Sequence, residues 1–377
     1  MSTALNPLQI VVFGSGTLQF LDAPPPKAPD DGFVWVFLSR DVFDVLLPRV
    51  QNIAQHLGGS PLLDLHCQDV RNATHPSDYD YTSVYDLVVF RRLKTEAEAR
   101  EMPAAPTTPA AAIEQGPGSL RRLGTYGVVF AIFDRLLISV HPEGCFTART
   151  FIDRYLADAA QSQGAQNASA RTRLPANPAD LMLRMANLMV ENSIDLRRKL
   201  GLQIERWQQD LLQPKSRFSD WTQLMGVRDE LHSLEDLCEE QQAALHEWLE
   251  ALREQPLGSQ DQGERDALVA RLRDVIEHID RVVRHARRME QSAETVMQIH
   301  FNLQGHRTND IMRTLTALTA VFLPLNLIAG IFGMNFEFVP LIHKADGFWI
   351  AMTSMALIAL ALVVVFQRKR YLARSGR

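Results

Sequence analysis

The sequence predicts a membrane protein of the α+β class, with an N-terminal α/β domain, a long stalk helix and two C-terminal transmembrane helices. Three observations support this prediction. Short runs rich in Val, Ile and Phe recur in the first part of the chain, strand signals vanish after Pro178, and two long uncharged segments lie near the end. The mean hydropathy of -0.10 hides this division, because it averages a polar first part with an apolar end.

Composition excludes several classes of protein. Charged residues make up 22% of the 377 residues and the net charge is -5, so we do not expect a nucleic-acid-binding protein. The three cysteines, Cys67, Cys145 and Cys238, form no CxxC pair, which fits a reducing compartment and argues against a thiolate metal site. The first residues lack a basic segment followed by a long apolar core, so we expect no cleavable signal peptide and a cytoplasmic N-terminus.

Residues 1–175 are expected to form the cytoplasmic α/β domain. A helix is expected at Val42–Leu57, with Pro48 either in its first turn or breaking it. Residues 102–118 are rich in Pro, Ala and Gly and predict a surface loop, and Gln161–Ala170 predicts a second, weaker break. The expected strands are Gln9–Phe13, Phe33–Phe37, Leu87–Phe90, Val128–Phe133 and Leu136–Val140.

The following part, residues 176–260, is expected to be cytoplasmic and helical. Ala179–Leu212 and Phe218–Glu254 both carry apolar residues at helical spacing, with charged residues between them. Pro214 and Pro256 separate these helices from the segments that follow them.

The longest predicted element runs from Asp261 to Gly330, with no proline before Pro324. At ~1.5 Å per residue, such a helix is on the order of 100 Å long, so it must pass from one layer of the molecule to another. We assign residues 261–313 to a stalk helix and residues 314–334 to the first transmembrane helix.

Two stripes follow different faces of the stalk helix. The first is an apolar seam with coiled-coil spacing, which packing against the protein's own helices would explain. It comprises Leu268, Leu272, Val275, Ile279, Val282, Ala286, Met289, Ala293 and Val296. The second stripe is polar but uncharged, and it is either a solvated face or the wall of a water-filled path. It comprises Gln291, Thr295, Gln298, Asn302, Gly305, Asn309 and Met312.

Two segments can cross a lipid bilayer. Leu315–Met334 and Gly347–Phe366 are uncharged and each is long enough for a hydrocarbon core of ~30 Å, so residues 347–367 are assigned to the second transmembrane helix. The loop at 335–346 has only Lys344 as a fixed positive charge, so it is expected outside, with both termini in the cytoplasm. Basic residues flank the pair at Arg307, Arg313, Arg368, Lys369, Arg370, Arg374 and Arg377, the last five within a basic tail at 368–377.

Two helices cannot enclose a path, so a pore would require a ring of subunits. Asn326 lies in the middle of the first span, where an amide is costly unless it faces water or a partner. Thr316 and Thr319 precede it, and Pro324 removes a backbone hydrogen bond and is expected to bend the helix. These residues indicate either a pore wall or helix–helix packing through polar and small side chains.

The first span ends in Gly333-Met334-Asn335, within the stretch LIAGIFGMNFEFVP. Together with Thr308–Phe338, the segment Arg273–His278 and the basic tail, this motif resembles the CorA superfamily of magnesium and related divalent-cation channels. The resemblance covers roughly Asp274–Arg370, whereas the N-terminal domain is similar only in general character.

The resemblance implies a funnel-shaped homopentamer in the bacterial inner membrane, with an α/β/α unit and a pore lined by five copies of the first span. It implies Mg²⁺ influx gated by intracellular cation, with no enzymatic activity and no cofactor. Asn335 is implied to bind the hydrated cation. Because Mg²⁺ gives up its waters reluctantly, a ring of amide oxygens can accept hydrogen bonds from the hydration shell without removing it. Gly333 would let the chain turn tightly.

Further roles follow from the same resemblance. Asp274 is implied to lie at a cytoplasmic subunit interface, where Mg²⁺ would bridge carboxylates that otherwise repel each other. An ordinary solvated charge is the alternative for Asp274. Met312 and Leu315 are implied to form a hydrophobic constriction that closes by dewetting. The pore-facing positions are Asn309, Met312, Leu315, Leu323 and Asn326.

The outer loop departs from the magnesium pattern. Residues 339–342 read Val-Pro-Leu-Ile where magnesium members often have Met-Pro-Glu-Leu, although Glu337 and Asp346 remain acidic. His343 is either an extra ligand for zinc, nickel or cobalt or an ordinary loop histidine. A transporter of Zn²⁺, Co²⁺ or Ni²⁺ resembling the ZntB branch, with or without proton coupling, is therefore an alternative. Neither span contains Asp, Glu or His, which favours passive flux.

Two other functions have less support in the sequence. A membrane-anchored oligomeric scaffold would need only generic apolar spans, without the uncharged stripe or Asn326. An enzyme has little support, because Gly14-Ser15-Gly16 is a lone GxG without the residues of a phosphate-binding loop. His66 beside Cys67, and His141 near Cys145, have neither zinc-ligand nor catalytic spacing, so we expect them in the core or on the surface.

Overall fold

The computed structural model describes residues 7–14, 17–94, 98, 124–143, 151, 153, 174–212, 221–254, 262–334 and 345–368. The chain divides into two compact units. The first comprises Met1–Arg206 and Ser219–Ala293, and the second comprises Trp207–Phe218 and Glu294–Arg377. The loops expected at 102–118 and Gln161–Ala170 lie outside the described residues.

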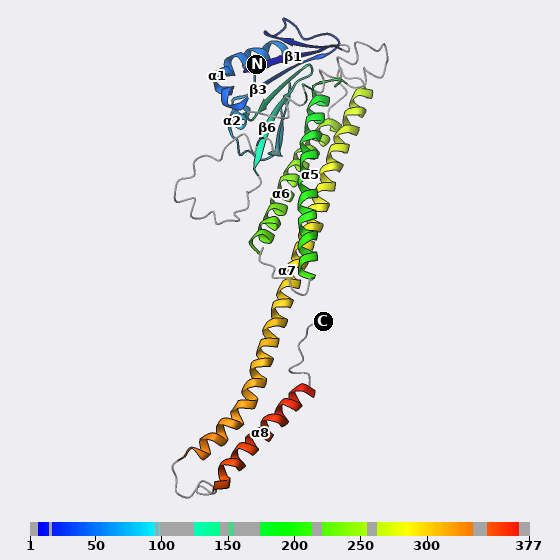
Figure 1. Ribbon diagram of the computed structural model, residues 1–377. Coiled ribbons are helices and arrows are strands. Elements are labelled where there is room, and N and C mark those ends of the chain that lie inside the picture. Colours follow the sequence, from blue (N-terminus) through cyan, green and yellow to red (C-terminus); the bar gives the residue numbers. More distant parts are fainter. Residues whose placement is uncertain are drawn as a thin grey trace. The chain divides into compact units, whose positions relative to one another are not determined.

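A seven-stranded mixed sheet forms one layer of the first unit within the described residues (Figure 1). Its order is β2-β1-β3-β7-β6-β5-β4, and the β3–β7 pair is parallel whereas the other neighbouring pairs are antiparallel. The strands are β1 (Leu8–Gly14), β2 (Thr17–Leu21), β3 (Phe33–Ser39), β4 (Asp78–Tyr81), β5 (Asp86–Leu93), β6 (Thr125–Ile132) and β7 (Leu136–His141). All five predicted strands are confirmed, whereas β2 and β4 were not predicted.

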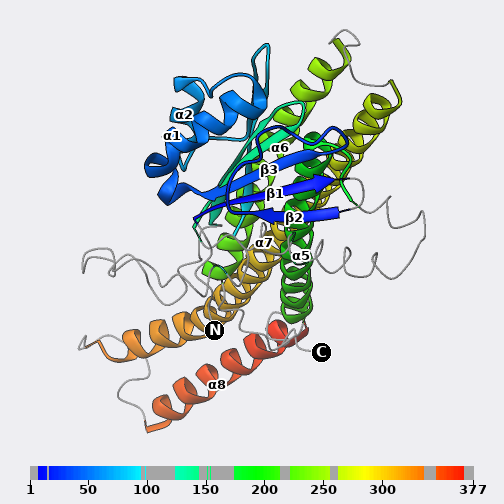
Figure 2. The ribbon, with the colours of Figure 1, turned by 90° about the horizontal axis from the view of Figure 1, so that it is seen from above.

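One face of the sheet packs against helices α1 (Phe43–Ile53) and α2 (Asp64–Arg71), which Figure 2 shows together on one side of the strands. Alternate strand residues such as Val36 and Ile138 join Val50 from α1 in this core. Each apolar side chain removed from water contributes about 1.5–3 kcal/mol, so this layer supplies much of the domain's stability. A short 3-10 helix (η1, Arg40–Val42) precedes α1 and a wider helical turn (η2, Ala54–Gly58) follows it.

The expectation for Pro48 was wrong. The residue lies inside α1, beyond the first turn, and the helix continues through it. Pro48 cannot donate to the carbonyl of Asp44, but both residues are exposed, so water can hydrate that carbonyl. The buried residues Phe43, Val50 and Ile53 hold the rest of the helix against the core.

Helices α5 (Pro178–Leu212) and α6 (Trp221–Glu254) pack with the first part of α7 (Gln262–Phe332) in the first unit. Leu272 and Ile279 in the apolar seam of α7 are both fully buried within a single chain. Most other members of the seam are buried as well, and Met289 is partly buried. The interpretation that this seam packs against the protein's own helices is therefore confirmed.

The second unit contains the remainder of α7 and helix α8 (Ala345–Arg368), which run antiparallel and side by side (Figures 1 and 2). Both helices are long and apolar enough to cross a membrane, judged by length and composition. Their large apolar side chains are exposed in the single chain, for example Leu323 at 70% and Trp349 at 69%. Exposed apolar surface on this scale marks contact with lipid or with other protein.

Candidate functional site

Helix α7 ends at Phe332, immediately before the Gly-Met-Asn motif. The Gly333 N–H donates to the Ala329 carbonyl at 2.9 Å, and the Met334 N–H donates to the Ile331 carbonyl at 3.3 Å. These bonds satisfy carbonyls that a helix end otherwise leaves without partners. Asn335, the residue expected to bind the cation, lies just outside the described residues, as do Glu337 and His343.

The backbone at position 333 leaves little room for a side chain. A Cβ atom at Gly333 would lie 3.1 Å from the Ala329 carbonyl oxygen and 3.6 Å from the Gly330 carbonyl oxygen. The described glycines with a positive φ angle are Gly32 and Gly59, so Gly333 does not use the left-handed region. Gly333 lies in a turn directly after α7, where a side chain would press against the Ala329 carbonyl oxygen.

The five residues expected to face a pore are exposed in the single chain. At about 100° per residue they fall within about 120° of the helix circumference, so they share one face. Three of them are apolar, with exposed fractions of 56% for Met312, 55% for Leu315 and 70% for Leu323. The described structure therefore leaves this face available to water, lipid or a second subunit.

The threonine hydroxyls near this face are already used. Thr316 Oγ1 donates to the Met312 carbonyl at 2.8 Å, and Thr319 Oγ1 donates to the Leu315 carbonyl at 2.9 Å. Such bonds to the preceding turn satisfy a hydroxyl donor within its own helix. These threonines are thus explained without a pore. The helix also continues through Pro324.

The cytoplasmic part of the uncharged stripe is exposed as well. Five residues of this part are exposed in the single chain: Gln291, Thr295, Gln298, Asn302 and Gly305. The stripe thus differs from the apolar seam, which the protein's own helices bury. A polar face without formal charge suits contact with water or with the same face of other copies.

Asp274 presents its carboxylate to solvent. Its side chain is 63% exposed, and it pairs with His278, whose Nε2 lies 3.8 Å from Asp274 Oδ1. His278 is itself positioned by a 2.9 Å hydrogen bond between its Nδ1 and Asn187 Oδ1. Asp346 lies exposed in the first turn of α8, where a negative charge interacts favourably with the helix dipole.

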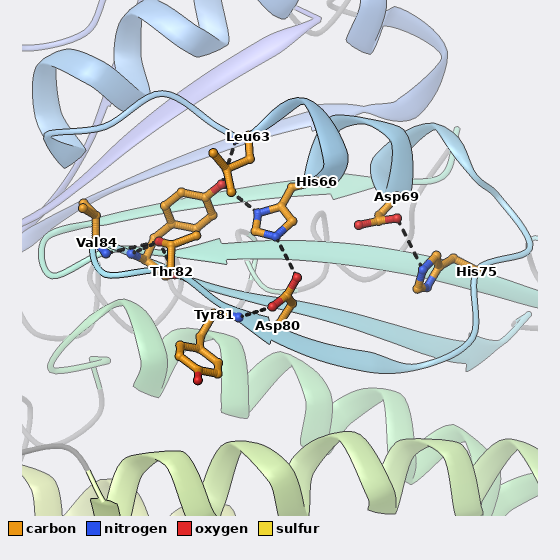
Figure 3. A network of polar contacts seen from close by, with 9 residues as sticks. Leu63, His66, Asp69, His75, Asp80, Tyr81, Thr82 and Val84 are labelled. Atoms are coloured by element: carbon orange, nitrogen blue, oxygen red, sulfur yellow. Dashed lines mark hydrogen bonds and ion pairs between the residues drawn. The ribbon is translucent and has the colours of Figure 1, made fainter.

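His66 forms the centre of a buried polar network that the sequence did not reveal (Figure 3). Its Nδ1 lies 2.7 Å from the Tyr85 hydroxyl and its Nε2 lies 3.0 Å from Asp80 Oδ2. The Tyr85 oxygen accepts from the Leu63 N–H at 2.9 Å, so its own hydrogen is directed to His66 Nδ1. Nε2 then carries the proton that His66 donates to Asp80.

This network resembles an acid–imidazole–hydroxyl relay in connectivity, but its hydroxyl is not accessible. Tyr85 is 3% exposed and His66 is 1% exposed, so no substrate can reach the oxygen. Burial also raises the pKa of Tyr85, which disfavours a nucleophilic phenolate. Of the two locations expected for His66, core or surface, the structure shows the core, and the network fixes α2 to β4 and to the residue that precedes β5.

The remaining candidates also have structural roles. His141 is buried, and its Nε2 lies 2.8 Å from Ser139 Oγ, which accepts a 2.8 Å hydrogen bond from Trp35 Nε1. Burial raises the pKa of the Cys238 thiol to about 12, so this cysteine is unreactive. Cys145 lies outside the described residues. Within the described part of the chain, no group of three His, Cys, Asp or Glu residues is arranged to hold a metal ion.

Comparison with known families decides the assignment. The sequence model of the family described as CorA-like Mg2+ transporter protein matches residues 110–370. The chain belongs to the CorA family. The match includes α5 to α8 and the Gly-Met-Asn motif, so the superfamily inferred from the sequence is confirmed.

Two curated relatives of this CorA-family chain align with it over short segments. The cobalt/magnesium transport protein CorA of Thermotoga maritima is 31% identical over 100 residues, which is 26% of this chain and 28% of the relative. The protein of the same name from Methanocaldococcus jannaschii is 36% identical over 78 residues, or 21% of this chain and 25% of the relative. The aligned segments thus span about a quarter of these relatives.

Solved structures extend the likeness to the whole fold. The CorA magnesium transporter from Methanocaldococcus jannaschii has a TM-score of 0.71 at 18% identity, covering 100% of this chain and 99% of that chain. The full-length CmaX protein has a TM-score of 0.62 at 16% identity, covering 96% and 97%. The ZntB cytoplasmic domain from Vibrio parahaemolyticus has a TM-score of 0.51 at 11% identity, covering 79% and 98%. The predicted N-terminal domain, long helix and two apolar C-terminal helices are confirmed as a CorA fold.

Proposed function

We propose that this CorA-family protein conducts Mg²⁺ and related divalent cations into the cell across the bacterial inner membrane. Family membership and the names of the curated relatives, which are cobalt/magnesium transport proteins, support this proposal. The proposed substrate is the cation itself, driven by its electrochemical gradient, and the protein is not an enzyme. Neither apolar span contains a titratable Asp, Glu or His that could carry a coupled proton.

The observation that carries the proposal is the uncharged exposed face of α7. It runs from Gln291 through Asn309 to Asn326 along one continuous helix, which ends at the Gly-Met-Asn motif. One chain cannot enclose a path with this face, so we propose a homopentamer in which five copies line the pore. Amide and apolar side chains would then form a wall that does not hold a divalent cation too tightly for conduction.

The proposed mechanism separates selection from closure. At the outer mouth, amide oxygens of Asn335 accept hydrogen bonds from the waters around Mg²⁺, which therefore keeps its hydration shell. At the cytoplasmic end of the span, rings of Met312 and Leu315 form an apolar constriction that excludes water in the closed state. Glu337 and Asp346 would attract cations to the mouth, because clustered negative charge raises the local cation concentration.

Gating is proposed to depend on Asp274. Among the described residues, its exposed carboxylate pairs with His278 at a long 3.8 Å, so a carboxylate of a neighbouring copy can approach it. Mg²⁺ between the two groups would cancel their repulsion and hold adjacent subunits together. Loss of that ion at low intracellular Mg²⁺ would loosen the ring and favour conduction.

The decisive experiment measures Mg²⁺ flux into liposomes that contain the purified full-length protein, compared with an Asn335→Ala variant. We expect flux that does not require a proton gradient and that falls to the rate of empty liposomes in the variant. The variant must keep the oligomer size and the apparent Tm of the wild type. A loss of flux is then caused by the missing Asn335 amide and not by misfolding. Flux that persists in a folded Asn335→Ala variant would contradict the proposal.

A zinc transporter of the ZntB-like kind is the second candidate. The observation that favours it is the outer loop, where Val339–Ile342 lacks an acidic residue and His343 follows. The same liposomes should then take up Zn²⁺, Co²⁺ or Ni²⁺ in preference to Mg²⁺, and a proton gradient should accelerate uptake. Absence of flux for every cation would instead support an oligomeric scaffold anchored in the membrane.

A further inference from the structure

Helix α7 carries four basic residues on one face within the first unit: Arg281, Arg284, His285 and Arg288. We refer to these four residues as the cationic face. Their spacing of three, four and seven positions brings their side chains together on the helix surface. The three arginines are exposed and His285 is partly buried.

Carboxylates of the same helix neutralise only part of the cationic face. Arg281 Nη2 lies 3.0 Å from Glu277 Oε1, and Arg284 pairs with Asp280. Within the described residues no carboxylate forms an ion pair with Arg288.

The guanidinium of Arg288 is instead held by uncharged groups. Its Nε donates to the Arg284 carbonyl at 3.2 Å, and its Nη2 lies 3.1 Å from His285 Nδ1. Since Arg288 can only donate, His285 Nδ1 accepts this bond and the ring is neutral, with its proton on Nε2. The pair therefore presents N–H groups outward and offers no acceptor of its own.

The register of α5 brings Arg197 to the same place. Asn187 of α5 contacts His278 of α7 at 2.9 Å, so the two helices touch at that level. Further along, a Cβ atom on Gly201 would lie 3.3 Å from Met289 Sδ. The helices thus run parallel over this stretch, and Arg197, between the two contacts on α5, lies beside the cationic face.

The electrostatic environment of His285 agrees with this placement. Burial lowers the pKa of His285, and the next causes, in order, are the positive charges of Arg197, Arg288, Arg281 and Arg284. Arg197 is the largest of the four electrostatic contributions, and it too forms no ion pair with a carboxylate of the described residues. Two guanidinium groups therefore converge without compensation by carboxylates.

We propose that Arg197, His285 and Arg288 bind the diphosphate group of a small soluble molecule such as a nucleotide. The planar fork of a guanidinium matches two phosphate oxygens, and two forks from different helices match a group with two adjacent phosphates. His285 supplies a third donor from Nε2. A monovalent anion would leave one of the two arginines without a partner, which is why the site favours a diphosphate.

This site does not depend on the proposed transport activity. Its residues belong to the helical layer of the first unit, and its ligand is an anion, whereas the proposed substrate is a cation. A bound anion would neutralise part of the charge on α7 just before the uncharged stripe, which continues the same side of the helix, because Arg284 and Arg288 each lie seven residues before a member of the stripe, Gln291 and Thr295.

Binding of inorganic pyrophosphate to the full-length protein in detergent tests the site, measured by equilibrium dialysis with EDTA present and at low salt. We expect saturable binding that weakens as NaCl is raised. The double variant Arg197→Gln with Arg288→Gln should bind at least about tenfold more weakly, because both charge-assisted contacts are lost. The matched control is Arg253→Gln with Arg273→Gln, which removes two exposed charges from α6 and α7 and should bind like the wild type.

The single variant Arg288→Lys keeps the positive charge but removes the guanidinium fork. Its affinity for pyrophosphate should lie between those of the wild type and the double variant. Equal affinity of the double variant and the control for pyrophosphate overturns the proposal. Absence of pyrophosphate binding to the wild type also overturns it. A smaller oligomer for the double variant would then give the arginines another role. In that case the arginines pair with carboxylates of a second copy. An unchanged apparent Tm in Arg288→Lys keeps the test valid even if the double variant folds poorly.

Discussion

Trp248 Nε1 donates a hydrogen bond to Asp86 Oδ2 across 3.2 Å, which joins the C-terminal part of α6 to the start of β5. The other carboxylate oxygen, Asp86 Oδ1, accepts from the Tyr79 hydroxyl at 3.1 Å. Gln241, seven residues earlier in α6, donates to the Arg91 carbonyl at 2.6 Å. These bonds connect buried polar groups of the sheet to α6, so both elements must remain in register for the groups to stay satisfied.

The Asp86→Asn variant should be as stable as the wild type at neutral pH, or more stable. Burial raises the pKa of Asp86, so its ionisation in the folded state opposes folding. The contribution of Asp86 to stability is full below the ordinary carboxyl pKa of about 3.9 and is lost as the pH rises through its raised folded-state pKa. The difference in apparent Tm between variant and wild type should therefore grow in favour of the variant from pH 4 towards pH 7, measured by tryptophan fluorescence.

The control for this prediction is Asp86→Ala. Asparagine can still accept from Trp248 and can donate to the Tyr79 oxygen, whereas alanine leaves both buried groups without partners. Each orphaned group costs about 1–3 kcal/mol, so the alanine variant should have a lower apparent Tm at every pH. A lower Tm for Asp86→Asn at pH 7 would show that the carboxylate's hydrogen bonds outweigh its desolvation.

The proposed constriction predicts that Leu315→Asn raises Mg²⁺ leakage at high intracellular Mg²⁺. A polar amide would keep water in a gap that closes by dewetting, so the closed state should conduct. Leu318→Asn is the matched control, since Leu318 is 54% exposed against 55% for Leu315 but lies outside the arc of proposed pore residues. Liposome flux at saturating internal Mg²⁺ measures the effect, and equal leakage from both variants would argue against a constriction at Leu315.

The proposed regulatory role of Asp274 predicts that Asp274→Asn flattens the dependence of flux on intracellular Mg²⁺. The amide neither repels its neighbour nor binds Mg²⁺ as a carboxylate does, so the ion loses its influence on the ring. Asp266→Asn removes a charge from another exposed position of α7 and should leave the dependence unchanged. The test is a series of flux measurements at increasing internal Mg²⁺. A dependence in Asp274→Asn like that of the wild type would make Asp274 an ordinary surface charge.

Glycine positions 330 and 333 should respond differently to alanine. A Cβ atom at Gly330 meets no heavy atom within 4 Å in the single chain, whereas one at Gly333 lies 3.1 Å from the Ala329 carbonyl oxygen. Gly333→Ala must displace that carbonyl by a few tenths of an ångström and so shift the residue that follows Met334. We expect reduced flux from Gly333→Ala and near-normal flux from Gly330→Ala. The opposite order would show that Gly330 is packed against another subunit.

The sequence predicted the elements whose pattern is local. The runs at Phe33–Phe37 and Leu136–Val140 are strongly apolar and bounded by breakers, and both are strands. The strand Asp78–Tyr81 was missed because its residues, Asp-Tyr-Asp-Tyr, have low strand propensity at two of four positions. It exists because its backbone pairs with β5, which local sequence does not reveal.

Only part of the candidate functional residues could be predicted from the sequence. The uncharged stripe could be found because helical spacing relates residues such as Gln298, Asn302 and Asn309 directly. The partners of His66 could not, because Asp80 and Tyr85 reach it only once the sheet has formed. Long-range pairings of this kind depend on strand register, and spacing in the sequence contains no signal for them.

The burial of the apolar seam bears on the order of biogenesis. Leu272 and Ile279 are covered within one chain, so the helical layer can fold before any other copy is present. Leu323 and Leu327, in contrast, are 70% and 65% exposed and remain unsatisfied until lipid or neighbouring chains surround them. The ribosome also completes the first unit almost entirely before the apolar helices emerge. In each newly made chain, the first unit can therefore be folded, and available to other copies, while the apolar helices are still being inserted into the membrane.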